Sequence, residues 1–328
     1  MPSPDAFSPD PFGTTAAPPL TKAPPLIVIA GATATGKTLL SLALAEAMGN
    51  AEIIGADSRQ VFRGMDIGTG KVDAETRRRL PHHGLDLAEP DEPFTVADYV
   101  RHVHGVLADL AERGAVAILA GGTGLYLRAV ARGVPVGATG RNVAVRAELE
   151  ARLLAGGLAP LVEQLQRAAP GVVAATDLAN SRRVVRALER VATTGDRPPP
   201  APVGYPGPVL WLGLTADPAE HRAAIAARAG GQFAGGLLEE AAALRERFGS
   251  TPAPFSAMGY REAFEVLDGQ RSVEAAVDAT ALRTWAYARR QRTWLRREPD
   301  ITWLTGTEGQ SLAIALETAE SFLGNRRS

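Results

Sequence analysis

The sequence predicts an α/β fold in which a parallel β-sheet core carries an all-helical insertion domain. Short apolar runs have the length and branching of buried parallel strands, and they occur at residues 26–30, 51–56, 115–120 and 209–214. Helical patterns follow these runs, which is the alternation that builds a parallel sheet. Residues 134–205 instead show only helical stripes, separated by glycine and proline. We therefore expect a core of residues 26–133 and 206–328, with residues 134–205 inserted as a helical domain.

The composition excludes several classes of protein. The 328 residues contain no cysteine, which rules out disulfides, thiolate catalysis and cysteine-ligated metals. No apolar run approaches the roughly 20 residues that span a bilayer, so we expect no membrane partner. Residues 1–25 contain eight prolines and no arginine, unlike a signal or transit peptide, and predict a disordered leader. Because this leader is neither a signal nor a transit peptide, we expect a cytoplasmic protein, and we also expect a monomer. The net charge of −1 argues against a protein coated in cations.

A phosphate-binding loop follows the first predicted strand. It matches the pattern G-x-x-x-x-G-K-S/T with a helical pattern after it, and comprises Gly31, Ala32, Thr33, Ala34, Thr35, Gly36, Lys37 and Thr38. The two glycines allow tight turns, so that backbone N–H groups and the helix N-terminus point at phosphate oxygens. Lys37 adds a cation, and the Thr38 hydroxyl can ligate Mg²⁺. We therefore expect a P-loop NTPase-like core that binds a di- or triphosphate.

Polar side chains also follow the second and third predicted strands, at the edge where open parallel sheets bind their ligands. Asp57 is either a catalytic carboxylate or a turn residue. Thr123 either donates a hydrogen bond to a ligand or caps the helix that follows it. The glycine-rich segment 61–71 is expected to line the site as a loop, with Lys71 exposed.

Two helical segments concentrate arginine. Residues 280–297 carry six arginines among aromatic side chains, without one acid between Arg283 and Arg297. A second cluster lies along one predicted helix and consists of Arg182, Arg183, Arg186 and Arg190. In a nearly neutral protein such clusters favour a phosphate backbone as partner, with the aromatics packed inward or stacked on bases. The alternative is an amphipathic helix whose charged face is only solvated.

An ordered set of motifs spans most of the chain. The segments are residues 31–38, 57–71, 82–86, 121–126, 180–189, 258–262 and 289–296. Together they resemble the tRNA dimethylallyltransferases, also called tRNA isopentenyl transferases; the phosphate loop alone is shared by many families, whereas the ordered set is specific. The chain departs from the family pattern at Ala32 and Ser181, where proline is frequent, and at Ala257 with Met258, where a bulkier aliphatic pair is usual. None of these departures removes a functional group.

The resemblance implies the transfer of a prenyl group. The phosphate loop would hold the diphosphate of dimethylallyl diphosphate, with Mg²⁺ near Thr38 as cofactor. Lys37 and, by family match, Arg222 would neutralise the diphosphate as it leaves. Asp57 would orient the N6 amine of the adenine on the 3′ side of the anticodon triplet and accept its proton.

The resemblance also implies a tRNA partner that is bound at its anticodon stem-loop. A stacked adenine cannot react, so the base must leave the stack and enter the site. Gln60 is expected to read a base edge, and Thr33 and Thr123 to lie near the reacting atoms. The residues expected to contact tRNA are Asp57, Ser58, Arg59, Gln60, Thr123, Arg146, Arg182, Arg183, Val184, Val185, Arg186, Ser256, Met258, Gly259, Tyr260 and Arg261.

Two other functions use the same phosphate loop. A small-molecule or nucleoside kinase that uses ATP would employ Lys37, Thr38 and Asp57, but it leaves the arginine-rich segments without a role. A non-catalytic RNA-binding NTPase switch would show nucleotide-dependent RNA affinity and no covalent product. The ordered motifs favour the transferase over both.

Overall fold

A computed structural model of the chain describes residue 20 and residues 22–137, 142–305 and 308–324. The leader predicted for residues 1–25 lies almost entirely outside the described residues. The core is a six-stranded parallel sheet in the order β3-β2-β4-β1-β5-β6. In chain order the strands are β1 (Leu26–Gly31), β2 (Ala51–Ala56), β3 (His82–His83), β4 (Val116–Gly121), β5 (Val209–Leu214) and β6 (Ile301–Leu304). The predicted α/β fold and its four buried strands are confirmed.

The two strands that the sequence did not predict lie at the edges of the sheet. β3 has two residues and β6 has four, which is too short for an apolar run to stand out. Both residues of β3 are half-buried, and in β6 the Trp303 residue is 41% exposed to solvent. Neither strand therefore shows the continuous burial of the central strands. Edge strands are covered on fewer sides and therefore need less apolar sequence.

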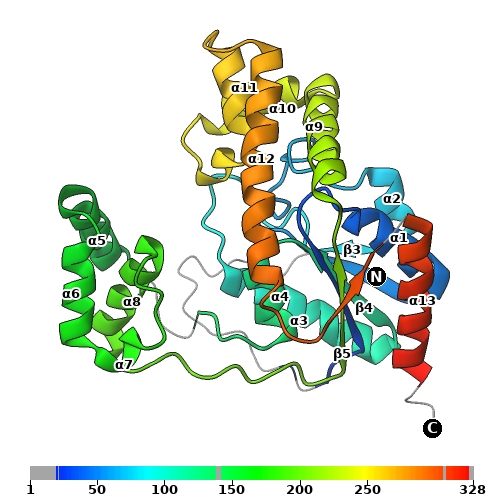
Figure 1. Ribbon diagram of the computed structural model, residues 1–328, viewed down its shortest axis with the longest axis horizontal. Coiled ribbons are helices and arrows are strands. Elements are labelled where there is room, and N and C mark those ends of the chain that lie inside the picture. The colour runs from blue at the N-terminus through cyan, green and yellow to red at the C-terminus, as the bar shows by residue number, and fades with distance from the viewer. Residues whose placement is uncertain (1–19, 21, 138–141, 306–307, 325–328) are drawn as a thin grey trace.

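Helices cover both faces of the sheet (Figure 1). On one face, α1 (Lys37–Met48) and α13 (Glu308–Gly324) pack on a core that includes Ile27 and Ile29. On the other, α3 (Val96–Arg113) and α4 (Gly124–Ala131) pack on a core that includes Val28 and Ala30. The alternation along β1 follows from the two-residue period of a strand, with both faces buried. The short helix α2 (Ala74–Arg79) precedes β3.

Helix α3 begins and ends where its local sequence directs. The Thr95 side chain accepts a hydrogen bond from the Asp98 N–H, and the Asp98 carboxylate accepts one from the Thr95 N–H. This capping box satisfies two N–H groups that the first helical turn leaves free. At the other end, Gly114 adopts a left-handed conformation with φ 66°. The residues at the two ends of α3 therefore explain both of its boundaries.

Four helices and a short 3₁₀ segment stand over the carboxyl ends of the strands (Figure 1). They are α9 (Pro218–Ala234), α10 (Leu237–Phe248), η1 (Ala253–Ser256), α11 (Tyr260–Leu267) and α12 (Val273–Leu295). α12 packs along α9 and reaches down to α4 and β1. It is the arginine-rich helix, and it starts earlier than the pattern at residues 280–297 indicates, because Ser272 caps its N-terminus.

The insertion is entirely helical in the part of the chain that the structure describes. It contains α5 (Val143–Gly156), α6 (Ala159–Ala168), α7 (Pro170–Val173) and α8 (Ser181–Thr194). These helices pack around their own apolar cluster, which includes Leu149, Leu165 and Leu188. Figure 1 shows them to one side of the sheet, joined back to β5 by a long extended segment. Among all helices described, none is both long and apolar enough to cross a membrane.

Candidate active site

The phosphate loop runs from β1 to α1 and turns at Ala34 and Gly36, whose φ values are 61° and 85°. Gly31 is not one of the turning positions. A Cβ atom at Gly31 would lie 2.6 Å from the Thr35 hydroxyl, so glycine is needed there for close approach. This corrects the expectation that both glycines serve the turns. Because Gly31 has no side chain, the Thr35 side chain can pack against it. The Thr35 hydroxyl donates to the Ala32 carbonyl at 2.9 Å, which keeps the loop tight.

Lys37 is folded back onto its own loop. Its Nζ donates to the Ala32 carbonyl at 2.6 Å. Burial, together with the neighbouring Arg228 guanidinium, lowers the pKa of Lys37 to about 8, while the Asp57 carboxylate acts in the opposite direction. Thr38 is exposed at the start of α1, and its carbonyl accepts from the Ser41 hydroxyl. A cation and a free helix N-terminus therefore lie at one anion site.

A cavity of about 460 Å³ opens beside this loop at the carboxyl edge of the sheet, and we call it the central cavity. Residues from the strand ends, the insertion and the helices above the sheet line it together. They are Thr33, Asp57, Ser58, Arg59, Gly68, Thr69, Arg182, Ile225, Arg228, Ala229, Gln232, Ser256, Ala257, Met258, Arg283, Thr284, Tyr287 and Arg290. The cavity thus brings together seven of the predicted residues from four regions of the chain.

Asp57 combines the two roles that the sequence left open. One carboxylate oxygen accepts from the Arg59 N–H at 2.8 Å, which is a turn contact. The carboxylate nevertheless lines the central cavity, together with Thr33. The Arg59 guanidinium extends across to the Ser256 hydroxyl at 3.3 Å. A turn bond that orients the carboxylate leaves its second oxygen for a ligand.

Thr123 does not cap its helix. It precedes α4, but its side chain makes no capping hydrogen bond. Its hydroxyl instead accepts from the Ser58 N–H at 3.1 Å. This contact ties the loop after β4 to the loop after β2, next to Asp57.

Arg228 is a candidate site residue that the sequence analysis did not assign. It lines the central cavity and donates to the Thr69 carbonyl at 3.0 Å. Arg222, which the resemblance suggested for the diphosphate, instead stacks on the Trp285 ring with its guanidinium carbon 4.8 Å from the ring centre. The two arginines are on the same helix but six residues apart, so they point to different sides. Arg228 shares its face with Ile225 and Gln232, a helical spacing that could have indicated it.

Several residues expected to contact tRNA lie elsewhere. The side chains of Val184 and Val185 are buried in the core of the insertion, so they offer RNA no surface. Arg146 and Arg186 both pair with the buried Glu189 carboxylate, at 2.5 and 2.8 Å. These two arginines neutralise a charge inside the insertion, and the buried glutamate explains why they are there.

Other predicted contacts hold the protein together. The Tyr260 side chain is buried, and its hydroxyl donates to Glu240 at 2.5 Å. The Gln60 amide donates to the carbonyls of Thr69 and Gly70, so it fastens the glycine-rich loop. Lys71 is also buried, not exposed as expected. Three oxygens surround its ammonium group, from the Phe62 carbonyl at 2.6 Å, Asp66 at 2.7 Å and Asp86 at 2.5 Å.

Two of the three remaining predicted contacts lie at the surface. Arg261 is exposed and pairs with Glu265 at 3.1 Å. Arg183 is exposed, 3.6 Å from Asp177. Gly259 is buried just before α11, where it adopts a φ of 93°. Of these three residues, only the arginines are accessible to a large partner, and none of the three lines the central cavity.

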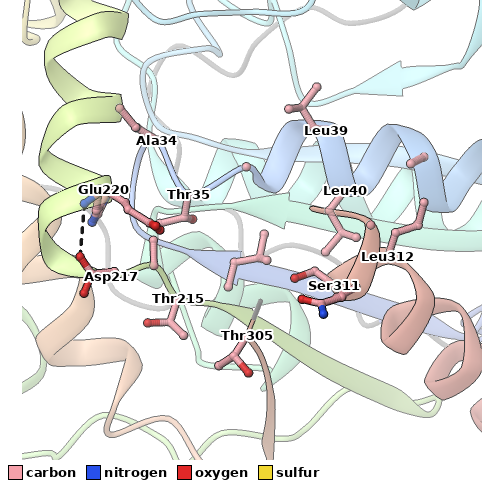
Figure 2. Close-up of a pocket in the computed structure, with 18 residues that line it drawn as sticks. Ala34, Thr35, Leu39, Leu40, Thr215, Asp217, Glu220, Thr305, Ser311 and Leu312 are labelled. Atoms are coloured by element: carbon pink, nitrogen blue, oxygen red, sulfur yellow. Dashed lines mark hydrogen bonds between the residues drawn. The ribbon is translucent and has the colours of Figure 1, made fainter. Parts of the chain in front are cut away.

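A second cavity, of about 900 Å³, lies on the other side of the phosphate loop, and we call it the lateral cavity (Figure 2). Ala34, Thr35 and Leu39 approach it from the loop and α1, facing Thr215 and Asp217 from the end of β5. Its wall also includes Glu220, Thr305, Ser311 and Leu312. The dashed line in Figure 2 marks the Asp217 carboxylate accepting from the Glu220 N–H, which caps α9. Asp57 is absent from this lining, so of the two cavities it lines only the central one.

Carboxylate and imidazole side chains are not clustered as a metal site. Within the described ranges, no three His, Asp or Glu side chains lie close enough together to hold an ion. His83 contacts Glu52 at 2.7 Å, and His82 contacts the Leu80 carbonyl at 2.7 Å. The adjacent histidines therefore have structural partners.

Comparisons with known proteins agree with this geometry. A sequence model of the family described as IPP transferase matches residues 60–298. A tRNA dimethylallyltransferase of Synechococcus sp. (strain CC9311) is 40% identical over 295 residues, covering 90% of this chain and 94% of its own length. One of Anaeromyxobacter dehalogenans (strain 2CP-C) is 42% identical over 284 residues, covering 85% and 94%.

A solved structure extends the similarity to three dimensions. The tRNA isopentenylpyrophosphate transferase of Bacillus halodurans superimposes with a TM-score of 0.68 at 34% identity, covering 92% of this chain and 97% of that one. The similarity extends over nearly the whole length of both proteins. The chain therefore belongs to the IPP transferase family.

Proposed function

We propose that this protein transfers the dimethylallyl group of dimethylallyl diphosphate to N6 of the adenine 3′-adjacent to the anticodon of tRNAs. Diphosphate is released, and the product is N6-(dimethylallyl)adenosine. One observation carries the proposal: Thr33 of the phosphate loop and Asp57, which follows β2, line the same cavity. Arginines from three helices line this cavity as well. Family membership supports the same reaction.

The diphosphate is assigned to the phosphate loop. Its backbone N–H groups and the N-terminus of α1 favour an anion, and Lys37 needs only to exchange the Ala32 carbonyl for a phosphate oxygen. Arg228 is the second cation that we assign to the diphosphate, because it shares the central cavity with Asp57. Charge neutralisation matters because an allylic C–O bond ionises more readily when its leaving group is stabilised.

Mg²⁺ is assigned a place beside Thr38. Its hydroxyl is an exposed oxygen donor next to the anion site, and no carboxylate cluster competes for the ion in the described part of the chain. Mg²⁺ bound largely by substrate phosphates needs few protein ligands, so this donor set fits. When bound, the ion supplies charge neutralisation at the diphosphate.

Asp57 is assigned the role of proton acceptor. In the transfer, the C–O bond to the diphosphate breaks, and a bond forms between the allylic carbon and adenine N6. N6 then loses one proton, for which the carboxylate oxygen not engaged in the turn is the acceptor. The Thr33 side chain, also in the central cavity, is placed to contact the reacting groups.

The tRNA is assigned to the rim of the central cavity. Arg182 reaches it from the insertion, and Arg283 and Arg290 reach it from α12, so cations lie on opposite sides of an entering base. Ser256 and Met258 complete the wall between them. We propose that residues 134–205 form a domain that contacts the anticodon stem-loop, and that the enzyme works as a cytoplasmic monomer.

A direct assay tests the reaction and the base together. The protein is incubated with Mg²⁺, unmodified tRNA and labelled dimethylallyl diphosphate, and the digested tRNA is searched for labelled N6-substituted adenosine. Asp57→Ala is expected to lower the transfer rate by about 10²–10⁴-fold with tRNA affinity retained, because a general base contributes about this factor. Asp91→Ala, at an exposed position, is the control. If the wild-type protein transfers no label to tRNA, the proposed reaction is refuted. If Asp57→Ala is fully active, the role of Asp57 as the general base is refuted.

A further inference from the structure

We propose that Gln291 is a positioning residue that sets the phosphate loop and the acceptor loops in register for the transfer. The inference rests on the proposed function, since it concerns how the two substrates meet. It assigns a role to a buried side chain of α12 that lines neither cavity.

The Gln291 amide uses both of its ends. It is 4% exposed, on the side of α12 that faces the sheet. Its Oε1 accepts from the Thr33 N–H at 2.8 Å, and its Nε2 donates to the Gly122 carbonyl at 2.9 Å. One side chain thus joins the loop after β1 to the loop after β4. The fit is close, because a Cβ atom at Gly122 would lie 2.3 Å from Nε2.

Two further hydrogen bonds extend this link to the segment that contains Asp57. Next to Gly122, the Thr123 N–H donates to the Ala56 carbonyl at 3.2 Å. The Thr123 hydroxyl accepts from the Ser58 N–H at 3.1 Å, and Ser58 follows Asp57. A continuous path therefore leads from the phosphate loop, which we assign to the diphosphate, to the carboxylate that we assign to the adenine amine.

The backbone of Thr33 is held on its carboxyl side as well. The His221 ring contacts the Thr33 carbonyl through Nε2 at 2.7 Å. A carbonyl only accepts, so Nε2 carries the hydrogen. α12 therefore holds the N–H of Thr33 and α9 holds its carbonyl. The peptide units before and after Thr33 are therefore both fixed, and the phosphate loop cannot rotate at this residue without breaking a bond to one helix.

The amide group of Gln291 is suited to both contacts. The position needs an acceptor for an N–H and a donor for a carbonyl at the same time, which a hydrocarbon of equal length does not offer. Such a bond pair matters most for the rate, because the reacting atoms must lie within about 3–3.5 Å and in line. If the reacting atoms are displaced by about 1 Å, the rate can fall by about 100-fold while the affinity for each substrate is unchanged.

A double-mutant cycle tests the link from its two ends. Gln291→Met removes both hydrogen bonds at similar volume, and Gly122→Ala places a methyl group against Nε2. Thr280→Val is the control on the same helix, since the Thr280 side chain is also buried. For each variant we would measure single-turnover transfer at saturation and the Kd of tRNA and of a non-reactive thio analogue of dimethylallyl diphosphate.

The proposal expects the rate at saturation to fall by about 100-fold in Gln291→Met, with both Kd values within about threefold of wild type. Gly122→Ala is expected to show the same kind of defect, and the double variant to be no slower than the slower single one, because both act on one contact. Thr280→Val is expected to transfer at the wild-type rate.

Three results would overturn the proposal: an unchanged rate in Gln291→Met, a double variant whose loss is the product of the single losses, or a loss confined to the Kd of the analogue. If one of the two single variants does not fold, the rate and Kd values of the other variant alone test the proposal. A wild-type protein without any transfer would instead overturn the proposed function.

Discussion

At the scale of single residues, the anion site is built from cations that repel one another. Lys37 and Arg228 are close enough for the arginine to lower the lysine pKa, and burial lowers the pKa of both. Groups held together against their repulsion are preorganised for a ligand of opposite charge. The Asp57 carboxylate raises the pKa of both groups, so the residue that we propose as the proton acceptor is close to the two cations.

We expect Arg228 and not Arg222 to determine the affinity for the diphosphate. Arg228→Met should weaken binding of dimethylallyl diphosphate by about 30-fold, because a hydrogen bond to a charged group contributes about 2 kcal/mol. Arg222→Met should remain within about threefold, since that guanidinium is stacked on Trp285. The measurement is calorimetric titration with the thio analogue. A larger loss at Arg222 would support the role that the family resemblance implies for it.

The depressed pKa of Lys37 predicts a pH dependence of diphosphate binding. A bound anion favours the charged amine, so above about pH 8 binding must also take up a proton. Affinity for the thio analogue should therefore be level between pH 7 and 8 and then fall, approaching about tenfold per pH unit. Lys37→Arg keeps its charge, and its affinity should show no such fall. The same slope in both proteins would place the titration on another group.

At the scale of elements, the glycine-rich loop is shaped by the helices that pack on it. The Glu240 carboxylate of α10 accepts from the N–H groups of Asp66, Ile67 and Gly68, at 3.0, 2.7 and 3.1 Å. Gln232 of α9 donates to the carbonyls of Ile67 and Gly68, both at 2.8 Å. The loop has little secondary structure of its own, so side chains satisfy its backbone. Gly68 and Thr69 are thereby presented to the central cavity.

Loss of the Glu240 carboxylate should destabilise the whole protein. Glu240→Ala leaves three N–H groups and the Tyr260 hydroxyl without their acceptor, and we expect a loss of about 3 kcal/mol in the free energy of unfolding. Urea denaturation measures it. The neighbouring Glu239→Ala is the matched control, because that side chain is exposed and should change stability by less than about 0.5 kcal/mol. Equal stability of the two variants would contradict the role of Glu240.

At the scale of the molecule, the net charge of −1 conceals a polarised surface. Arg289 and Arg290 are exposed near the C-terminus of α12, and Arg296 and Arg297 are exposed directly after it. None of the four has an acidic partner among the ion pairs of the described residues. Other arginines are paired, such as Arg113 with Glu52 and Asp109. Unbalanced cations near the central cavity provide the electrostatic attraction that a nucleic acid requires.

The salt dependence of tRNA binding tests this surface. Replacing both Arg289 and Arg296 with alanine should weaken tRNA binding and reduce the slope of log K against log salt by about 1.5, because each lost phosphate contact removes about 0.7–0.9. Arg113→Ala changes the formal charge at the opposite edge of the sheet and should leave the slope unchanged. Equal slopes in all three proteins would show that the α12 arginines do not contact the phosphate backbone.

Local sequence determined the parts of this protein whose structure depends on neighbouring residues. The apolar runs indicated the four central strands, the loop pattern indicated the anion site, and Thr95 with Gly114 marked the ends of α3. Hydrogen bonds and side-chain periodicity within these segments are formed over a few residues, so the chain carries their signal directly. The ordered motifs likewise indicated the family, because each motif is a short contiguous segment of the chain.

Only the tertiary structure decided which side chains meet in the site. Arg222 and Arg228 have the same chemistry and the same helix, but the docking of α9 turns only Arg228 into the central cavity. Thr123 bonds to Ser58 instead of capping α4, and Gln291 bonds to two loops about 170 and 258 residues away in the chain. Such contacts depend on the angle and depth at which helices pack on the sheet. No local pattern encodes these quantities, because they result from the whole core at once.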